Sequence, residues 1–130
     1  MHPVVSIVGK SGVGKTALVE QLIAEFKRRG YRIATAKHSR RAIEIDQPEK
    51  DSWKFARAGS DGVVLSFPGK LAFVKTMEQE PSIEEISHLI GGDFDLILTE
   101  GFRSDIAPKI EVYKRELGED LLCPAEELSA

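Results

Sequence analysis

The feature that most constrains the fold of this chain is a glycine-rich pattern near its amino terminus. The pattern G-x-x-x-x-G-K-[ST] is met at every fixed position by the run Gly9, Lys10, Ser11, Gly12, Val13, Gly14, Lys15 and Thr16. Its glycines allow backbone conformations closed to other residues, so that N–H groups ahead of a helix can surround an anion. Lys15 can reach the outer phosphates, and the hydroxyl of Thr16 can bind Mg²⁺. The pattern predicts a phosphate-binding loop, with all eight residues as candidate nucleotide-binding residues.

The residues on either side of this loop support that interpretation. Residues 4–8 (VVSIV) are typical of a short buried strand that enters the loop. After the loop, Leu18, Leu22 and Phe26 recur at helical spacing and predict an amphipathic helix. Gly30 is the expected stop of that helix. Strand, loop and helix therefore follow in the order that the motif requires, and we expect the chain to bind a nucleoside triphosphate or its diphosphate.

Composition and charge narrow the class of protein. The chain has 130 residues and a formal net charge of -3, which argues against a protein that coats nucleic acid. Cys123 is the only cysteine, so no internal disulfide or cysteine metal cage can form. The sequence contains no apolar run of the roughly 18 residues that a membrane helix needs, and no signal peptide precedes the first strand. We therefore expect one cytoplasmic domain over residues 1–130, with neither nucleic-acid nor membrane partners.

The rest of the chain alternates between strand and helix patterns. Strands are expected at 31–36, 63–66, 71–74, 94–101 and 109–113, helices at 51–58 and 83–90, a loop at 40–50 and a helical turn at 124–128. Pro68 and Gly69 fit the centre of a type II turn, so the strands that flank them should form a hairpin on the sheet edge. Strands separated by helices imply parallel pairing. The expected fold is a three-layer α/β/α sandwich of the P-loop NTPase type, with a mainly parallel sheet and an edge hairpin.

A phosphate-binding loop of this kind needs a second carboxylate to hold Mg²⁺, and two residues are candidates. Glu100 ends the apolar run 96–99, where the carboxyl ends of parallel strands form the ligand crevice. Asp46 lies in the loop after the second strand, from which it could approach the metal. Asp95 lies at the start of its strand and should face away from the site. We therefore expect Thr16, Glu100 and Asp46 to be the metal-binding residues.

Basic residues end the second strand on the same rim. Lys37 could neutralise a terminal phosphate, and His38 could donate a hydrogen bond to it or to a partner; both could equally keep the rim soluble. The roles of Arg40 and Arg41 are left open. No Gln or Ser/His/Asp set is placed to activate water, so Lys15 is the best catalytic candidate. The [NT]KxD signature for guanine is also missing, and the residues alone do not decide between GTP and ATP.

Several short motifs together resemble a known family. The P-loop is followed in order by Lys37-His38, Asp46, Lys50-Asp51-Ser52, Ala58-Gly59, Glu100-Gly101-Phe102 and Pro108-Lys109-Ile110-Glu111-Val112. The same order occurs in the MobB family, the molybdopterin-guanine dinucleotide biosynthesis adapter proteins. The P-loop is shared by many unrelated enzymes, whereas the later motifs are selective. The resemblance extends over nearly the whole chain.

The resemblance implies a function that the residues alone do not. It implies a protein that binds GTP and Mg²⁺, hydrolyses GTP weakly at most and forms homodimers. It also implies a partner: the guanylyltransferase that joins GMP to molybdopterin, with other cofactor-biosynthesis proteins as further partners. By position, Gly12, Gly14, Lys15 and Thr16 would bind phosphate and metal. Glu100 would support Mg²⁺, and Lys37, His38 and Asp46 would line the facing rim.

Three departures from the family pattern affect these expectations. Further histidines often follow the K-H pair, whereas this chain has Ser39, Arg40 and Arg41. Glu49 replaces the glycine of the family's G-K-D-S motif. Family chains also usually continue with another strand and helix, which we expect this chain to lack. That difference bears on the dimer and on any base-binding residues located there.

Two other classes of function remain compatible with the residues. A small-molecule kinase would use the same loop and strand-end acid, although only Arg40 and Arg41 resemble the lid that it needs. A regulatory ATPase would also use the loop. A metal-delivery role is less favoured, because the chain lacks clustered Cys and His residues.

Overall fold

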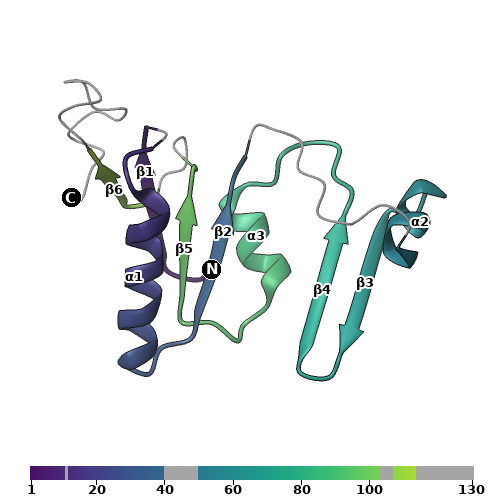
Figure 1. Cartoon of the computed structure of the whole chain (residues 1–130), viewed down its shortest axis with the longest axis horizontal. Helices are drawn as coiled ribbons and strands as arrows, with labels where there is room; N and C mark the ends of the chain where they lie inside the picture. The colour runs from purple at the N-terminus through teal and green to yellow at the C-terminus, as the bar shows by residue number, and fades with distance from the viewer. Residues whose placement is uncertain (11, 40–49, 103–106, 114–130) are drawn as a thin grey trace. The chain divides into compact units, whose positions relative to one another are not determined.

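A computed structural model describes residues 1–10, 12–39, 50–102 and 107–113 of the chain (Figure 1). Its contacts divide the chain into two compact units. Unit 1 comprises Met1–Arg40 and Ser82–Ala130, and unit 2 comprises Arg41–Pro81. The sequence gives no signal of this division, and the grouping of both units into one domain stays a prediction. The expected helical turn at 124–128 lies outside the described residues.

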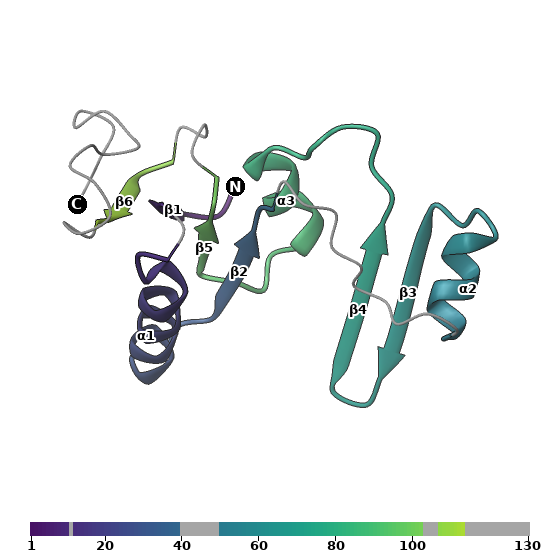
Figure 2. The ribbon, with the colours of Figure 1, turned by 45° about the horizontal axis from the view of Figure 1, so that its top comes forward.

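Unit 1 is built on a parallel sheet with the strand order β2-β5-β1-β6, seen again in Figure 2. Its strands are β1 (Val4–Gly9), β2 (Ile33–Lys37), β5 (Leu96–Glu100) and β6 (Lys109–Val112), and every neighbouring pair is parallel. The expected parallel α/β architecture is confirmed. All four strands therefore end on the same edge of the sheet, which gathers residues from distant parts of the chain.

Two helices of unit 1 cover opposite faces of this sheet: α1 (Lys15–Arg28) and α3 (Ile83–Ile90). Val4 and Ile97 are register partners and pack in one core cluster with Ile83 of α3. Glu100 lies three residues beyond Ile97 and so points to the other face, where Thr16 of α1 contacts it. Unit 1 thus has the predicted three layers.

The central strands are apolar because both of their faces are covered. Ile7, Val8 and Ile97 are completely buried, and burial of such a side chain contributes about 1.5–3 kcal/mol. The buried hydroxyls of this core are paired, since Thr99 Oγ1 donates a hydrogen bond to Ser6 Oγ at 2.8 Å.

The helix α3 begins as its sequence predicts, because the Ser82 side chain accepts from the Glu85 N–H at 3.1 Å. No described helix is long and apolar enough to cross a membrane.

Unit 2 consists of α2 (Asp51–Arg57), β3 (Gly62–Phe67) and β4 (Lys70–Lys75). The predicted hairpin is confirmed as an antiparallel pair, and Gly69 has the positive φ of 79° that its turn position requires. Its predicted place on the edge of the parallel sheet is wrong, because β3 and β4 form a separate two-stranded sheet. Turn chemistry specifies how two adjacent strands pair, but it does not specify what the hairpin's outer edges contact.

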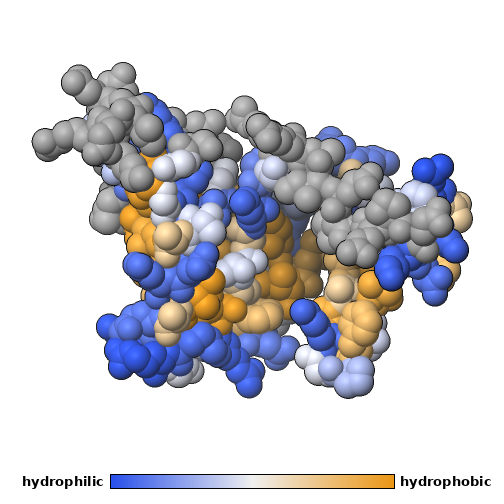
Figure 3. All heavy atoms as spheres, viewed as in Figure 1, coloured by the Kyte–Doolittle hydropathy of each residue, from blue (hydrophilic) through white to orange (hydrophobic). Residues whose placement is uncertain are grey.

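One face of this hairpin is apolar and exposed. Val64 and Phe73 are register partners on that face. Leu71 lies two residues before Phe73 in β4 and therefore points to the same face. All three are exposed, Leu71 at 67%, and Figure 3 shows apolar colouring over β3 and β4. The opposite face is better covered, since Val63 is buried. An apolar face of this kind is unusual on a sheet that is only in contact with water.

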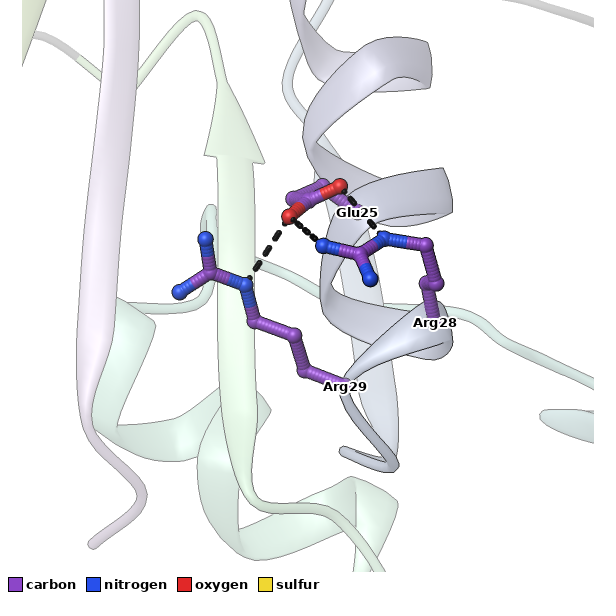
Figure 4. Close-up of polar contacts among 3 residues, drawn as sticks. All are labelled: Glu25, Arg28 and Arg29. Atoms are coloured by element: carbon purple, nitrogen blue, oxygen red, sulfur yellow. Dashed lines mark hydrogen bonds and ion pairs between the residues drawn. The ribbon is translucent and has the colours of Figure 1, made fainter.

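The last turn of α1 carries a three-residue ionic cluster on its surface (Figure 4). The Glu25 carboxylate accepts hydrogen bonds from Arg28 Nε at 3.0 Å and from Arg29 Nε at 2.9 Å. The hydrogen bond from Arg28, and to a smaller extent that from Arg29, lowers the pKa of Glu25 below its ordinary value. The basic residues also lie at the helix end where the dipole favours positive charge.

The Glu25 cluster should give α1 a small, pH-dependent stabilisation. Because the folded-state pKa of Glu25 is lowered, this contribution is present above the unfolded pKa and is lost as the pH falls through the folded pKa. We expect Glu25→Gln to destabilise the protein slightly at neutral pH and by less at a pH below the unfolded pKa of Glu, which is about 4.3. Urea unfolding at both pH values measures the difference. Glu20→Gln on the same helix is the matched control, and an effect that persists at acid pH would point to packing instead.

Candidate functional site

The glycine-rich loop links the end of β1 to the start of α1, as its pattern predicts. Three of its glycines have positive φ values: 155° at Gly9, 79° at Gly12 and 102° at Gly14, which is the N-cap of α1. Gly9 has a second constraint, because a Cβ there would lie 2.6 Å from the Val112 carbonyl oxygen of β6. The loop therefore begins tightly against β6 and turns into the helix through conformations that favour glycine.

A cavity of about 530 Å³ lies at the loop and at the carboxyl ends of β2 and β5. All of its lining residues belong to unit 1. They are Gly12, Gly14, Lys15, Thr16, Ala17, Lys37, His38, Glu100 and Gly101. The backbone N–H groups that open α1 meet basic side chains and one carboxylate here, which is the composition expected of a site for a phosphate–metal complex.

Lys15 has an internal partner in this structure. Its ammonium donates a hydrogen bond to the Gly9 carbonyl at 2.8 Å, across the base of the loop. The side chain is thus held over the loop while it still lines the cavity. A carbonyl is a weaker partner for an ammonium group than an anion is, so this contact can be exchanged for a phosphate oxygen.

Thr16 and Glu100 meet across the cavity although 84 positions separate them in the chain. The Thr16 hydroxyl donates to the Glu100 carboxylate, and its Oγ1 lies 3.3 Å from Oε1 and 3.5 Å from Oε2. Adjacent oxygen ligands of Mg²⁺ lie about 3 Å apart, since each metal–oxygen distance is about 2.1 Å. A small shift would let both groups bind one ion, so the two residues fit a magnesium site.

The described residues offer such an ion few ligands besides this pair. The described part of the chain contains no group of three or more acidic, His or Cys side chains that could hold a metal. Mg²⁺ typically keeps waters and binds substrate phosphates alongside one or two protein oxygens. The pair Thr16–Glu100 therefore fits Mg²⁺ that arrives with a nucleotide. Asp46, the other predicted ligand, lies outside the described residues.

Lys37 and His38, the basic residues at the end of β2, are held beside the end of β5 by the pairing of the two strands. Lys37 and Glu100 are register partners in the parallel pair β2–β5, and the Lys37 ammonium lies 4.0 Å from Glu100 Oε1. The next backbone N–H, that of His38, donates to the Glu100 carbonyl at 2.9 Å. The His38 ring packs on Phe102 with a centroid distance of 5.5 Å. The predicted rim residues Lys37 and His38 thus do line the cavity.

Gly101 is held at the tip of β5 by the neighbouring strand end. Its φ is 94°, and a Cβ there would lie 2.8 Å from the His38 carbonyl oxygen. A side chain at this position would therefore meet backbone that cannot move without breaking the strand pairing. This close approach keeps the tips of β2 and β5 together beside the loop.

Only some of the predicted site residues line the cavity. Gly12, Gly14, Lys15, Thr16, Lys37, His38 and Glu100 line the cavity, whereas Gly9, Lys10 and Val13 do not. Val13 is buried, so only its backbone could face a ligand. Ser11, Asp46, Arg40, Arg41 and Cys123 lie outside the described residues. Ala17 lines the cavity and was not predicted, although its place in the first helical turn after the loop could have indicated it.

Asp95 lies at the other end of β5, as predicted. Its carboxylate accepts a hydrogen bond from the Arg32 backbone N–H at 2.8 Å, and its own N–H donates to the Arg32 carbonyl. The residue therefore joins the starts of β2 and β5. It has a structural role far from the cavity.

The chain is similar to known proteins over most of its length. Residues 4–130 match the family model of MobB, described as "Molybdopterin guanine dinucleotide synthesis protein B". A protein of Haemophilus influenzae named "Molybdopterin-guanine dinucleotide biosynthesis adapter protein" is 34% identical over 120 residues, which are 92% of this chain and 67% of that protein. A protein of the same name from Escherichia coli is 31% identical over an alignment of 124 positions that covers 91% of this chain and 69% of that protein.

Solved structures show the same likeness. A crystal structure of molybdopterin-guanine biosynthesis protein B aligns with a TM-score of 0.68 and 33% identity, over 83% of this chain and 67% of that one. Bacillus subtilis MobB aligns with a TM-score of 0.72 and 24% identity, over 88% of this chain and 71% of that one, which shows the fold alone. The chain spans about two thirds of the length of its curated bacterial relatives.

The close approach at Gly101 makes a direct prediction about stability. Gly101→Ala combines a strained backbone conformation with a collision, and we expect it to lower the free energy of unfolding by on the order of 1–3 kcal/mol. Gly92→Ala is the matched control, because a Cβ there meets no atom within 4 Å and no positive φ is involved. Chemical unfolding of both variants measures the effect. Equal stability of the two variants would show that the β2–β5 tip is not tight.

Proposed function

Because this chain belongs to the MobB family, we propose that it is a GTP-binding adapter protein in molybdenum cofactor biosynthesis. In this role it would assist the guanylyltransferase that converts molybdopterin to molybdopterin guanine dinucleotide. The observation that carries the proposal is the contact between Thr16 and Glu100, at a cavity that Lys15 also lines. The cavity thus brings together the loop, a cationic side chain and the two oxygen-bearing side chains that we propose as metal ligands, as a nucleotide site of this kind requires.

The proposed roles of the site residues follow from their chemistry. The loop Gly9–Thr16 would hold the phosphates through backbone N–H groups, and Lys15 would neutralise the outer ones. Thr16 and Glu100 would hold Mg²⁺, with Asp46 as a further candidate ligand. Lys37 and His38 line the opposite rim. Bound Mg²⁺ would supply charge neutralisation at the phosphates.

Hydrolysis would be slow in such a site. Lys15 can stabilise charge at a phosphate, but a lysine that remains an ammonium does not activate water. Among the described residues that line the cavity, His38 and Glu100 are the only groups besides Lys15 with a side chain that could act as a base. The Glu100 carboxylate accepts a hydrogen bond from the Thr16 hydroxyl, and the His38 ring packs on the Phe102 ring. We therefore propose weak GTP hydrolysis at most, in a protein that works in the cytoplasm mainly by binding.

We also propose that the protein is a homodimer that uses the exposed apolar face of the hairpin. This face, formed by Val64, Leu71 and Phe73, belongs to unit 2 alone. Three large apolar side chains on one face of a two-stranded sheet favour burial against another surface. A second copy of the chain presents the same face, so a twofold contact would cover both copies at once.

Loss of the loop lysine should remove both nucleotide binding and adapter activity. We expect Mg²⁺ and GTP to stabilise the wild-type protein by about 2.7 kcal/mol at 100 times Kd, with a much smaller effect of ATP. Lys15→Ala should abolish this stabilisation. It should also abolish any stimulation of the guanylyltransferase, measured as dinucleotide formed from molybdopterin and GTP. Thermal unfolding and the coupled transferase assay provide the two readouts.

The control for this experiment is Lys27→Ala, which removes the same charge from the far end of α1. It should leave both readouts unchanged. Stabilisation by ATP rather than GTP would contradict the guanine assignment and favour a regulatory ATPase. Phosphate transfer to a small acceptor at about 1–100 s⁻¹ would identify a kinase instead.

The dimer is tested on the hairpin. We expect Leu71→Glu to shift the protein from dimer to monomer in sedimentation equilibrium, because a carboxylate would be buried at the proposed contact. Leu89→Glu is the matched control: Leu89 is also exposed, at 48%, but lies on α3 of unit 1. Dissociation by both variants, or by neither, would exclude the hairpin face as the contact.

A further inference from the structure

The register of the sheet places a positive charge beside the proposed metal ligand. Lys37 and Glu100 are partners at the ends of β2 and β5, so their side chains leave the same face of the sheet at the same level. The Lys37 ammonium lies 4.0 Å from Glu100 Oε1, and both residues line the cavity. In this structure Lys37 thus occupies the position of a counter-cation to Glu100.

The two partners of this ion pair are held very differently. The Glu100 side chain is 15% exposed, whereas that of Lys37 is 64% exposed. The Glu100 carboxylate also accepts a hydrogen bond from the Thr16 hydroxyl. An ion pair at this distance contributes little to stability when its lysine is mostly exposed to water. The carboxylate is therefore fixed, and the ammonium on its long side chain can leave at little cost.

Two cations would compete for the same carboxylate once a metal–nucleotide complex binds. A divalent ion at Thr16 and Glu100 would repel the Lys37 ammonium from its place. A terminal phosphate in the shared cavity offers the displaced ammonium a new anionic partner. A diphosphate lacks that phosphate and its charge, so displacement of Lys37 would then go without compensation.

We propose that Lys37 is a specificity-determining residue that moves from Glu100 to the terminal phosphate. The proposal rests on the proposed function, since it requires a nucleotide and Mg²⁺ at this site. A ligand shifts an equilibrium only by its differential affinity for the two states. Here the terminal phosphate supplies that difference, and the site favours a nucleoside triphosphate over a diphosphate through Lys37.

The test compares Lys37→Met with wild type, because methionine keeps an unbranched apolar stem and removes only the charge. Kd values for a non-hydrolysable GTP analogue and for GDP are measured by calorimetry at saturating Mg²⁺. We expect the affinity for the analogue to fall about tenfold, which corresponds to about 1.4 kcal/mol. The affinity for GDP should stay constant or rise, because the competitor of the metal is gone. The melting temperature of the nucleotide-free protein should not change.

Lys27→Met is the matched control, with the same charge change at the far end of α1, and it should leave both Kd values unchanged. An equal loss of affinity for both nucleotides in Lys37→Met would overturn the proposal and make Lys37 a general phosphate contact. Unchanged affinity for both would overturn it as well, while the proposed function would stand. Failure of the wild-type protein to bind either guanine nucleotide would overturn the proposed function together with this inference.

Discussion

The parallel pairing of β5 with β1 and β2 is the interaction on which the site depends. It aligns Glu100 with Ile7 on one side and with Lys37 on the other. The loop that follows β1 opens α1 over the same face, and Thr16 thereby meets a carboxylate 84 positions away. Without this register the loop would keep its conformation at the start of α1, but Glu100 and Lys37 would not be brought beside Thr16.

The close backbone contacts around the cavity serve that register. Gly9 lies against the Val112 carbonyl, and Gly101 lies against the His38 carbonyl. At both positions only a residue without a Cβ lets two strand ends approach. At the far end of the sheet, Asp95 joins β5 to β2 through Arg32. β5 is thus joined to β2 at both of its ends, and backbone hydrogen bonds connect the tip that carries Glu100 to both neighbouring strands.

Unit 1 was largely predictable because its signals are local and repeat along the chain. Apolar runs gave β1 and β5, helical spacing gave α1, and a capping box gave α3. The hairpin of unit 2 was predicted from its turn residues, but its place in the sheet was not. Pairing within a hairpin is decided by the turn, whereas the neighbour of an outer edge is decided by contacts between distant segments. For the same reason the exposure of Val64 and Phe73 has no sequence signal, because continuous apolar runs such as 63–65 and 71–74 are typical of strands covered on both faces.

The phosphate-binding loop is predicted from sequence alone, because the loop glycines, Lys15 and Thr16 lie within eight consecutive residues at the spacing that the motif requires. The sequence also named Lys37 and Glu100 as candidates, since charged residues at strand ends collect at the ligand edge of a parallel sheet. Only the tertiary structure decided that these two face each other at 4.0 Å, with the lysine exposed and the carboxylate held. Strand order and register are set by packing across the whole sheet, and no local pattern in either strand records which partner it will have.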